Sequence, residues 1–149
     1  MNSLEYYQQL LKGGCTGDRL IRCPAIEPLP KQVEIVNACV DIARRLRIPL
    51  PKRIDVRWKY GSRAWEFTRG ATSHNSATRE ISVFLDATLD PTELRRISFH
   101  ELGHVSLYFS GAYRNMSLAA QEMSCDRFAI RALEAEAERR GYYHRRCAS

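Results

Sequence analysis

The fold of this chain is set by residues 90–111, which read DPTELRRISFHELGHVSLYFSG. The stretch begins with a typical helix start: Asp90 can accept from unpaired backbone N–H groups, Pro91 fits the first helical position, and Glu93 can reach back to the cap. It ends with Gly111, and glycine readily adopts the left-handed backbone that closes a helix. The stretch therefore predicts one long helix that ends just before this glycine.

The middle of this helix contains an H-E-x-x-H motif, formed by His100, Glu101 and His104. Four residues make about one helical turn, so both imidazoles project from one face and can hold one metal ion. The glutamate beside them can reach a water molecule bound to that ion. The motif therefore predicts a metal site with a carboxylate base.

On a helical wheel the motif lies on the apolar side of the helix, on a stripe that also carries Leu94, Ile97 and Val105. An ionisable cluster buried there costs several kcal/mol if it is left unpaired. A bound metal would satisfy the imidazoles. The structural alternative is two histidines with ordinary hydrogen-bond partners and a solvated Glu101.

A second long helix, predicted from Leu118 to Arg140 and closed by Gly141, offers the missing ligand. A catalytic zinc takes three protein ligands and a water, and the motif supplies only two. Glu122 lies on the apolar face of this helix, and Asp126 follows one turn later. We expect Glu122 to be the third ligand and Asp126 to accept from a ligand imidazole. Asp126 as third ligand is the main alternative, and a salt bridge or helix-dipole contact is the structural explanation for Glu122.

The residues before these helices predict a further helix and a small sheet. Apolar residues follow a helical rhythm from Lys31 to Leu46, and two prolines stop it. The polar run 72–76 suits a turn. Three stretches show the alternation of half-buried strands: 54–60, 63–70 and 79–85. The order helix, strands, helix, helix is an α+β pattern.

The chain has 149 residues, of which 44% are hydrophobic and 27% charged. That length and balance are typical of one soluble globular domain. Residues 1–30, punctuated by glycine and proline, predict a peripheral N-terminal arm, and residues 31–149 predict the single domain. No apolar run reaches the length of a membrane span, and the first residues lack a signal-peptide core. We therefore expect a cytoplasmic protein without membrane contact.

The formal net charge of +6 allows an acidic partner such as nucleic acid. The basic residues are almost all arginine, and they are scattered along the chain rather than grouped in a block. Scattered charges are typical of a solvated surface. A nucleic-acid partner is therefore an alternative that the sequence does not favour.

The cysteines do not form a recognisable framework. They are Cys15, Cys23, Cys39, Cys125 and Cys147, an odd number without a Cys-x-x-Cys pair. This spacing argues against a zinc ribbon and a complete disulfide set. Cys39 lies on a predicted helix, where packing is its expected role. A cysteine-switch role for Cys15 or Cys23 in the arm stays open.

Two spaced motifs together resemble the gluzincin arrangement of zinc metallopeptidases: H-E-x-x-H at 100–104 and E-x-x-x-D at 122–126. Within that group the chain is similar to the compact ImmA/IrrE-type metallopeptidases, which typically show Glu-x-x-Ala-Asn/Asp-x-Phe-Ala. Here residues 122–129 read EMSCDRFA, with Cys125 in place of the alanine. The resemblance covers roughly residues 32–135 in element order.

The resemblance implies a minimal zincin-like fold of the α+β class, with a small mixed or antiparallel sheet packed on the active-site helix and the second ligand-bearing helix. It implies one Zn²⁺ per chain, held by His100, His104 and Glu122, with Asp126 steadying a ligand histidine. The implied activity is hydrolysis of peptide bonds in a protein or peptide substrate, with Glu101 as the proton carrier. Such proteins are frequently carried by phages and mobile elements, and some act on a repressor.

That architecture also implies where a substrate lies. An edge strand beside the active-site helix pairs with the extended substrate backbone, and residues 79–85 are the candidate. A group that stabilises the oxyanion or contacts the substrate is expected as well. The candidates for this role are His74, Tyr60, Tyr113 and His144.

Related metal motifs fit the sequence less well. A metzincin would place a glycine and a histidine where the chain has Leu107 and Ser110, after His104. A peptide deformylase would use a cysteine in a Gly-Cys-Leu context, which Cys39 lacks, and a SprT-type protease would have a further histidine before His144. From another class, a catalytically silent zinc-site scaffold that acts as an antirepressor or a DNA-associated binding protein stays open.

Overall fold

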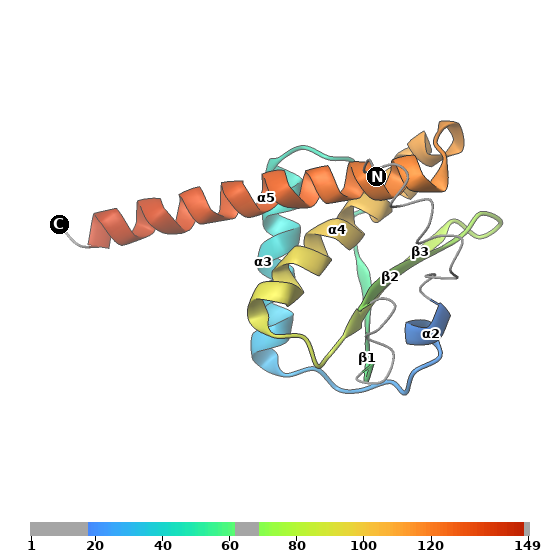
Figure 1. The fold of residues 1–149 in the computed structure, drawn as a ribbon, viewed down its shortest axis with the longest axis horizontal. Helices are drawn as coiled ribbons and strands as arrows, with labels where there is room; N and C mark the ends of the chain where they lie inside the picture. The colour runs from blue at the N-terminus through green and yellow to red at the C-terminus, as the bar shows by residue number, and fades with distance from the viewer. Residues whose placement is uncertain (1–17, 62–68, 148–149) are drawn as a thin grey trace, which may run out of the picture.

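A computed structural model describes residues 18–61 and 69–147, which form helices packed on a small sheet (Figure 1). The helices are α2 (Asp18–Ile21), α3 (Pro30–Arg45), α4 (Pro91–Ser110) and α5 (Leu118–Cys147), with the short 3-10 helix η1 (Ala112–Asn115) before α5. The strands are β1 (Asp55–Lys59), β2 (Gly70–Asn75) and β3 (Glu80–Asp86). The predicted α+β class is therefore confirmed. Within the described ranges, none of the helices combines the length and the apolar character that a bilayer crossing requires.

β3 is the central strand of the sheet, whose order is β1-β3-β2. β1 runs parallel to β3, with Val56 opposite Val83, and β2 runs antiparallel to it, with Thr72 opposite Val83. The prediction that residues 79–85 form an edge strand is therefore wrong, because β3 is paired on both sides. Among the described residues, β2 is the edge strand beside α4. The strand candidate 63–70 falls mostly outside the described residues, and only its end enters β2.

The polar run 72–76 lies almost entirely in β2, so the turn predicted there is wrong. The turn comes later, where Asn75 Oδ1 accepts from the backbone N–H groups of Ala77 and Thr78 at 3.0 and 3.3 Å. Arg79 closes it with a φ of 63°, in the left-handed region. The side chain of Asn75 therefore ends the strand and starts the turn.

The helix ends follow the local signals with one exception. Asp90 Oδ1 accepts from the Glu93 N–H at 2.8 Å at the start of α4, and Gly111 closes α4 with a φ of 82°. α5 runs past Gly141 to Cys147, so the predicted stop there is wrong. Glycine closes a helix when it turns left-handed, and Gly111 alone among the described glycines has a positive φ. In helical conformation Gly141 costs only about 1 kcal/mol relative to alanine.

The sheet separates two apolar clusters of unequal size. Val83 and Leu85 of β3 belong to the main core, which α3, α4 and α5 share. Phe84 belongs to the second cluster, with Ala71 and the fully buried Leu20 of α2. Figure 1 shows α3 and α4 on one side of the sheet and α2 on the other. The described part of the predicted N-terminal arm therefore covers the second face of the sheet.

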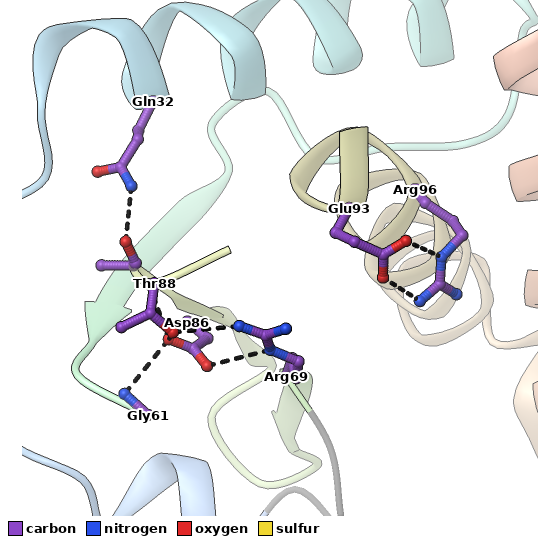
Figure 2. Close-up of polar contacts among 8 residues, drawn as sticks. Gln32, Gly61, Arg69, Asp86, Thr88, Glu93 and Arg96 are labelled. Atoms are coloured by element: carbon purple, nitrogen blue, oxygen red, sulfur yellow. Dashed lines mark hydrogen bonds and ion pairs between the residues drawn. The ribbon is translucent and has the colours of Figure 1, made fainter. Parts of the chain in front are cut away.

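Asp86, at the end of β3, is fully buried and fastens several neighbours to the sheet (Figure 2). Its carboxylate accepts from the Gly61 N–H at 3.3 Å, from the Thr88 hydroxyl at 2.7 Å and N–H at 2.8 Å, and from Arg69 Nε at 3.4 Å. Gln32 of α3 donates to the carbonyl of the residue after Asp86 at 2.8 Å. These contacts fix the turn that leads from β3 into α4, and so the place where α4 begins.

Candidate metal centre

α4 presents His100 and His104 one turn apart. Their ring centroids are 5.0 Å apart. His104 is buried, whereas the His100 side chain keeps 16% of its surface exposed. The pair therefore lies at the edge of the core, where a ligand can reach it from solvent.

Both imidazoles converge on one carboxylate, that of Glu122 in α5. Glu122 Oε2 lies 2.9 Å from His100 Nε2, and Glu122 Oε1 lies 2.7 Å from His104 Nε2. The other nitrogen of His100, Nδ1, lies 2.7 Å from Asp126 Oδ1. The two helices thus bring the expected ligands together and place Asp126 on the outer side of His100.

The close approach of α4 and α5 depends on Gly103, the residue before His104. A Cβ added to Gly103 would lie 3.1 Å from both the Cα and the Sγ atoms of Cys125, which is tighter than ordinary van der Waals contact. Cys125 is buried and lies between Glu122 and Asp126 in the sequence. Glycine at this position therefore lets α5 carry both carboxylates to the histidines.

Glu101 follows His100 in the motif and is buried against β2. Thr72 Oγ1 lies 3.2 Å from Glu101 Oε2 and can donate to it. Gly70 makes room for the same side chain, because a Cβ there would overlap Ile97 Cγ2 and lie 3.1 Å from Glu101 Cγ. Ligand atoms of Glu101 and of both motif histidines all lie within 4.8 Å of one another, so this cluster could hold a metal ion.

The charges of the centre stabilise one another. Burial alone would raise the pKa of Glu122, but hydrogen bonds to His100 and His104 outweigh burial and hold this pKa well below its usual range. Burial alone would lower the pKa of His104, but its interactions with the Cys125 thiol and with Glu122 outweigh burial and raise this pKa to about 11. Without a metal, the pair is therefore a carboxylate facing an imidazolium.

A row of aromatic rings continues from His104 along α4. The ring centroid of Tyr108, one turn later, is 6.3 Å from that of His104. His74 of β2 stacks on Tyr108 at 4.7 Å, and Tyr113 of η1 meets His74 edge-on at 5.2 Å. Two of the four candidate substrate contacts, His74 and Tyr113, therefore lie beside the centre.

Of the other two candidates, Tyr60 is not brought to the centre. Tyr60 lies just after β1, on the far side of β3 from β2, and it is 52% exposed. Its backbone N–H donates to the Pro24 carbonyl at 2.9 Å, and none of its described contacts reaches the histidines. The side chain of His144 lies outside the described part of the chain.

The described thiols are all free. Cys39 is fully buried in the main core, as its packing role predicts. The Cys23 thiol donates to a backbone carbonyl of α2 at 3.1 Å, and Cys15 lies outside the described residues. The part of the arm that is described therefore brings no thiol to the metal centre.

The sequence did not identify two neighbours of the centre, Thr72 and Tyr108. Tyr108 could have been found, because it lies one helical turn after His104. Thr72 had no usable signal, since it stands in the polar run that predicts a turn. Its contact with Glu101 depends on the pairing of β2 with β3, which brings residues distant in the sequence together.

No family model matches the chain, and no curated protein or solved structure matches it either. The arrangement of His100, Glu101, His104, Glu122 and Asp126 is therefore the basis on which a function can be proposed.

Proposed function

We propose that this chain is a zinc-dependent metallopeptidase that hydrolyses peptide bonds of a protein substrate, with one zinc ion per chain. The observation that carries the proposal is the convergence of His100 Nε2 and His104 Nε2 on the carboxylate of Glu122, at 2.9 and 2.7 Å. A buried glutamate, Glu101, lies in the same cluster. Two imidazoles, one carboxylate and an adjacent carboxylate base are the parts that a hydrolytic zinc site requires.

The donor set suits zinc. Imidazole nitrogen and carboxylate oxygen are usual zinc ligands, and three protein ligands leave one position for water in a catalytic site. Asp126 supports the assignment, because ligand histidines commonly donate their outer N–H to a carboxylate. With Nδ1 of His100 directed to Asp126, its Nε2 is left for the metal.

Zinc bound by these residues would supply an activated water and polarise the scissile carbonyl. Glu101 is placed to take a proton from that water and to pass it to the leaving amine. Burial raises the pKa of Glu101, which suits a group that must both accept and donate a proton. The Thr72 hydroxyl orients the carboxylate for this transfer.

β2 is the strand that we propose for substrate pairing, since it is the described edge strand beside α4. An extended peptide can add to such an edge through main-chain hydrogen bonds. His74 lies on this strand, and Tyr108 and Tyr113 surround its ring. These rings would contact substrate side chains beyond the metal. A regulatory protein, as the resemblance implies, is the substrate class to test first.

Metal analysis of the purified chain tests the site. We expect about one zinc per chain, lost in His104→Ala and in Glu122→Ala. Glu101→Gln should keep the zinc and lose peptidase activity against a peptide library. Full zinc in Glu122→Ala would show that Glu122 is not the third ligand.

The same Glu101→Gln variant separates catalysis from a silent scaffold. A scaffold that acts by association, as an antirepressor or a DNA-associated protein, would keep its biological effect in this variant, because zinc and fold persist. A peptidase would lose the effect. An unchanged effect would therefore refute the peptidase proposal.

A further inference from the structure

We propose that a basic surface on the far side of α5 from the metal centre binds the phosphate backbone of duplex DNA. The surface is formed by the end of α3, the connection from α3 to β1, and one side of α5. Its seven cationic side chains are all exposed: Arg44, Arg45, Arg47, Lys52, Arg53, Arg127 and Arg131. This inference goes beyond the peptidase proposal and does not rest on it.

Hydrogen bonds to backbone carbonyls hold the three parts of this surface together. Arg131 Nη2 of α5 donates to the Leu46 carbonyl at the end of α3, at 3.2 Å. Arg44 Nη2 donates to the carbonyls of Pro51 and Lys52, at 2.8 and 3.0 Å. Arg127 lies one helical turn before Arg131 on the same side of α5. Cations that the sequence scatters are therefore gathered by the fold.

The charge of the basic surface is poorly compensated. Arginines elsewhere are commonly paired with carboxylates: Arg57 with Asp55, Arg69 with Asp86, Arg95 and Arg140 with Glu136, and Arg96 with Glu93. None of the seven cations of the basic surface forms an ion pair within residues 18–61 and 69–147. Of the carboxylates nearest to these cations along the chain, Asp126 beside Arg127 contacts His100, and Asp55, two residues after Arg53, pairs with Arg57. Asp41 lies a turn before Arg44 and Arg45, and Glu134 lies a turn after Arg131.

Helix-end effects explain why a basic residue is favourable at only some of these seven positions. Arg44 and Arg45 lie in the last turn of α3, where a positive charge favours the helix dipole. Lys52, Arg53 and Arg127 are not part of that last turn. Arg47 has a φ of 62°, a left-handed conformation that glycine would adopt with less strain. Its backbone N–H donates to the Arg44 carbonyl at 3.0 Å and so closes α3, while its side chain is exposed.

The chemistry of the basic surface favours phosphate over a membrane. Most of the apolar residues interleaved with the cations pack against the main core: Leu46, Ile48, Leu50 and Ile54. Ile130, which is 59% exposed beside Arg131, is a single exposed apolar side chain and not an apolar face. Six of the seven cations are arginine, whose planar guanidinium matches phosphate oxygens. A lipid-binding surface would instead combine cations with exposed apolar groups.

The side chains of the basic surface also indicate whether a single strand or a duplex would bind to it. Among the described residues, the aromatic side chain adjacent to these cations, Phe128, packs against the main core, so it does not offer a face for unpaired bases to stack on, which disfavours a single strand. Guanidinium and ammonium groups serve the phosphate oxygens of a duplex, whereas proteins that select duplex RNA also contact its 2′-hydroxyls across the minor groove. Duplex DNA, held by its phosphates without base recognition, fits these side chains best.

DNA on this surface leaves the metal centre open. Arg131 comes nine residues after Glu122 in α5. At about 100° per residue, the two side chains leave the helix on opposite sides. A bound duplex would therefore not cover His100 or His104, and a protein substrate could reach the centre while the chain is on DNA.

The proposal can be tested by fluorescence anisotropy. A labelled, mixed-sequence DNA duplex of about 20 base pairs is titrated with the full chain at salt concentrations of about 50 to 200 mM. Each phosphate neutralised contributes about 0.9 to the slope of log K against log salt, so five contacts give a slope of about −4.5. In Arg45→Gln/Arg53→Gln/Arg127→Gln the slope should become shallower by about 2 to 3. The same positions changed to lysine should keep most of the slope, because the charges remain.

The matched control is Arg22→Gln/Lys31→Gln/Arg139→Gln, which removes the same charge from exposed residues outside the basic surface. Its slope should stay near that of the unchanged chain. Zinc content and circular dichroism of both variants confirm their folding. A wild-type slope near zero, or an equal loss in the control, would overturn the proposal. Tighter binding of polyglutamate, of vesicles with anionic lipid, or of duplex RNA than of DNA at equal charge would overturn it too.

Discussion

Glu122 divides its two carboxylate oxygens between the imidazoles of the helix motif, with Oε2 2.9 Å from His100 Nε2 and Oε1 2.7 Å from His104 Nε2. One carboxylate can reach both rings only if α4 and α5 keep a fixed spacing. That spacing is set where Gly103 faces Cys125. Gly103, which lies between His100 and His104, is therefore as important for the geometry of the centre as the ligands are.

Replacing Gly103 by alanine tests this dependence. The added methyl would meet Cys125 Cα and Sγ at 3.1 Å, so α5 must shift and carry Glu122 away from the histidines. We expect zinc affinity, measured by competition with a chelator, to fall about 10- to 100-fold, as when the support of a metal ligand is lost. Gly141→Ala in α5 is the matched control, and it should keep zinc affinity and gain up to about 1 kcal/mol of stability. Equal affinities in the two variants would contradict the prediction.

The hydroxyl of Thr72 should matter for turnover and not for metal binding. Thr72→Val removes the 3.2 Å contact with Glu101 Oε2 and keeps the shape of the side chain. One hydrogen bond is worth about 1 kcal/mol, so peptidase activity should fall about fivefold to tenfold while the zinc content stays unchanged. Thr72→Ser, which keeps the hydroxyl, should restore most of the activity. If the valine variant lost zinc, the role of Thr72 would be structural instead.

The contact of β2 with α4 can be tested by a double-mutant cycle at Gly70 and Ile97. Gly70→Ala should destabilise the fold by about 1 to 3 kcal/mol, because the methyl overlaps Ile97 Cγ2. Ile97→Ala removes that atom at its own cost of about 2 to 5 kcal/mol. In urea unfolding, the double variant should be more stable than the sum of the single effects predicts, by at least about 0.5 kcal/mol. Strict additivity would show that the two residues do not meet.

Cys39 should make stability fall at alkaline pH. Burial, with a smaller contribution from the charge of Glu136, raises the pKa of Cys39 from 9.0 to about 12. Between these values the unfolded chain loses a proton that the folded chain keeps, so stability decreases as pH rises through this range; below it the thiol contributes nothing. The loss should reach about 2 kcal/mol near pH 10.5.

The measurement for Cys39 is urea unfolding at about pH 8 and pH 10.5, with Cys39→Ala for comparison. Other groups ionise in the same range, so the difference between the two proteins isolates the thiol. Alkylation at the lower pH gives a second readout, since the fully buried Cys39 should react only through unfolding while the partly exposed Cys23 reacts in the native chain. Equal pH dependence in the two proteins would rule out the buried thiol as the cause.

The helices and the polar residues of the metal centre could be predicted because their signals are local. Asp90 and Gly111 bound α4 by contacts within one turn. The helical period alone placed His100 and His104 on one face, and it placed Glu122 on the apolar side of α5. Two apolar helix faces in one small domain pack together, so the convergence of these side chains followed from the sequence pattern.

The sheet could not be predicted in the same way, since strand order depends on pairing between distant residues. Nothing in residues 79–85 shows that β3 has two neighbours, and the polar β2 resembles a turn because its side chains serve Glu101 and Tyr108 rather than the apolar core. The basic surface was missed for a similar reason. Arg131 is far from the end of α3 in the sequence, and it reaches the Leu46 carbonyl only after α3 and α5 have packed.

The buried carboxylate of Asp86 holds Gly61 on one side and Arg69 on the other, and these residues bracket positions 62–68. The chain therefore leaves β1 and enters β2 at one anchor, on the strand with which both β1 and β2 pair. Gly70 and Thr72, which lie against Glu101, follow directly from that anchor. A change at Asp86 would thus reach Glu101 through the backbone of β2.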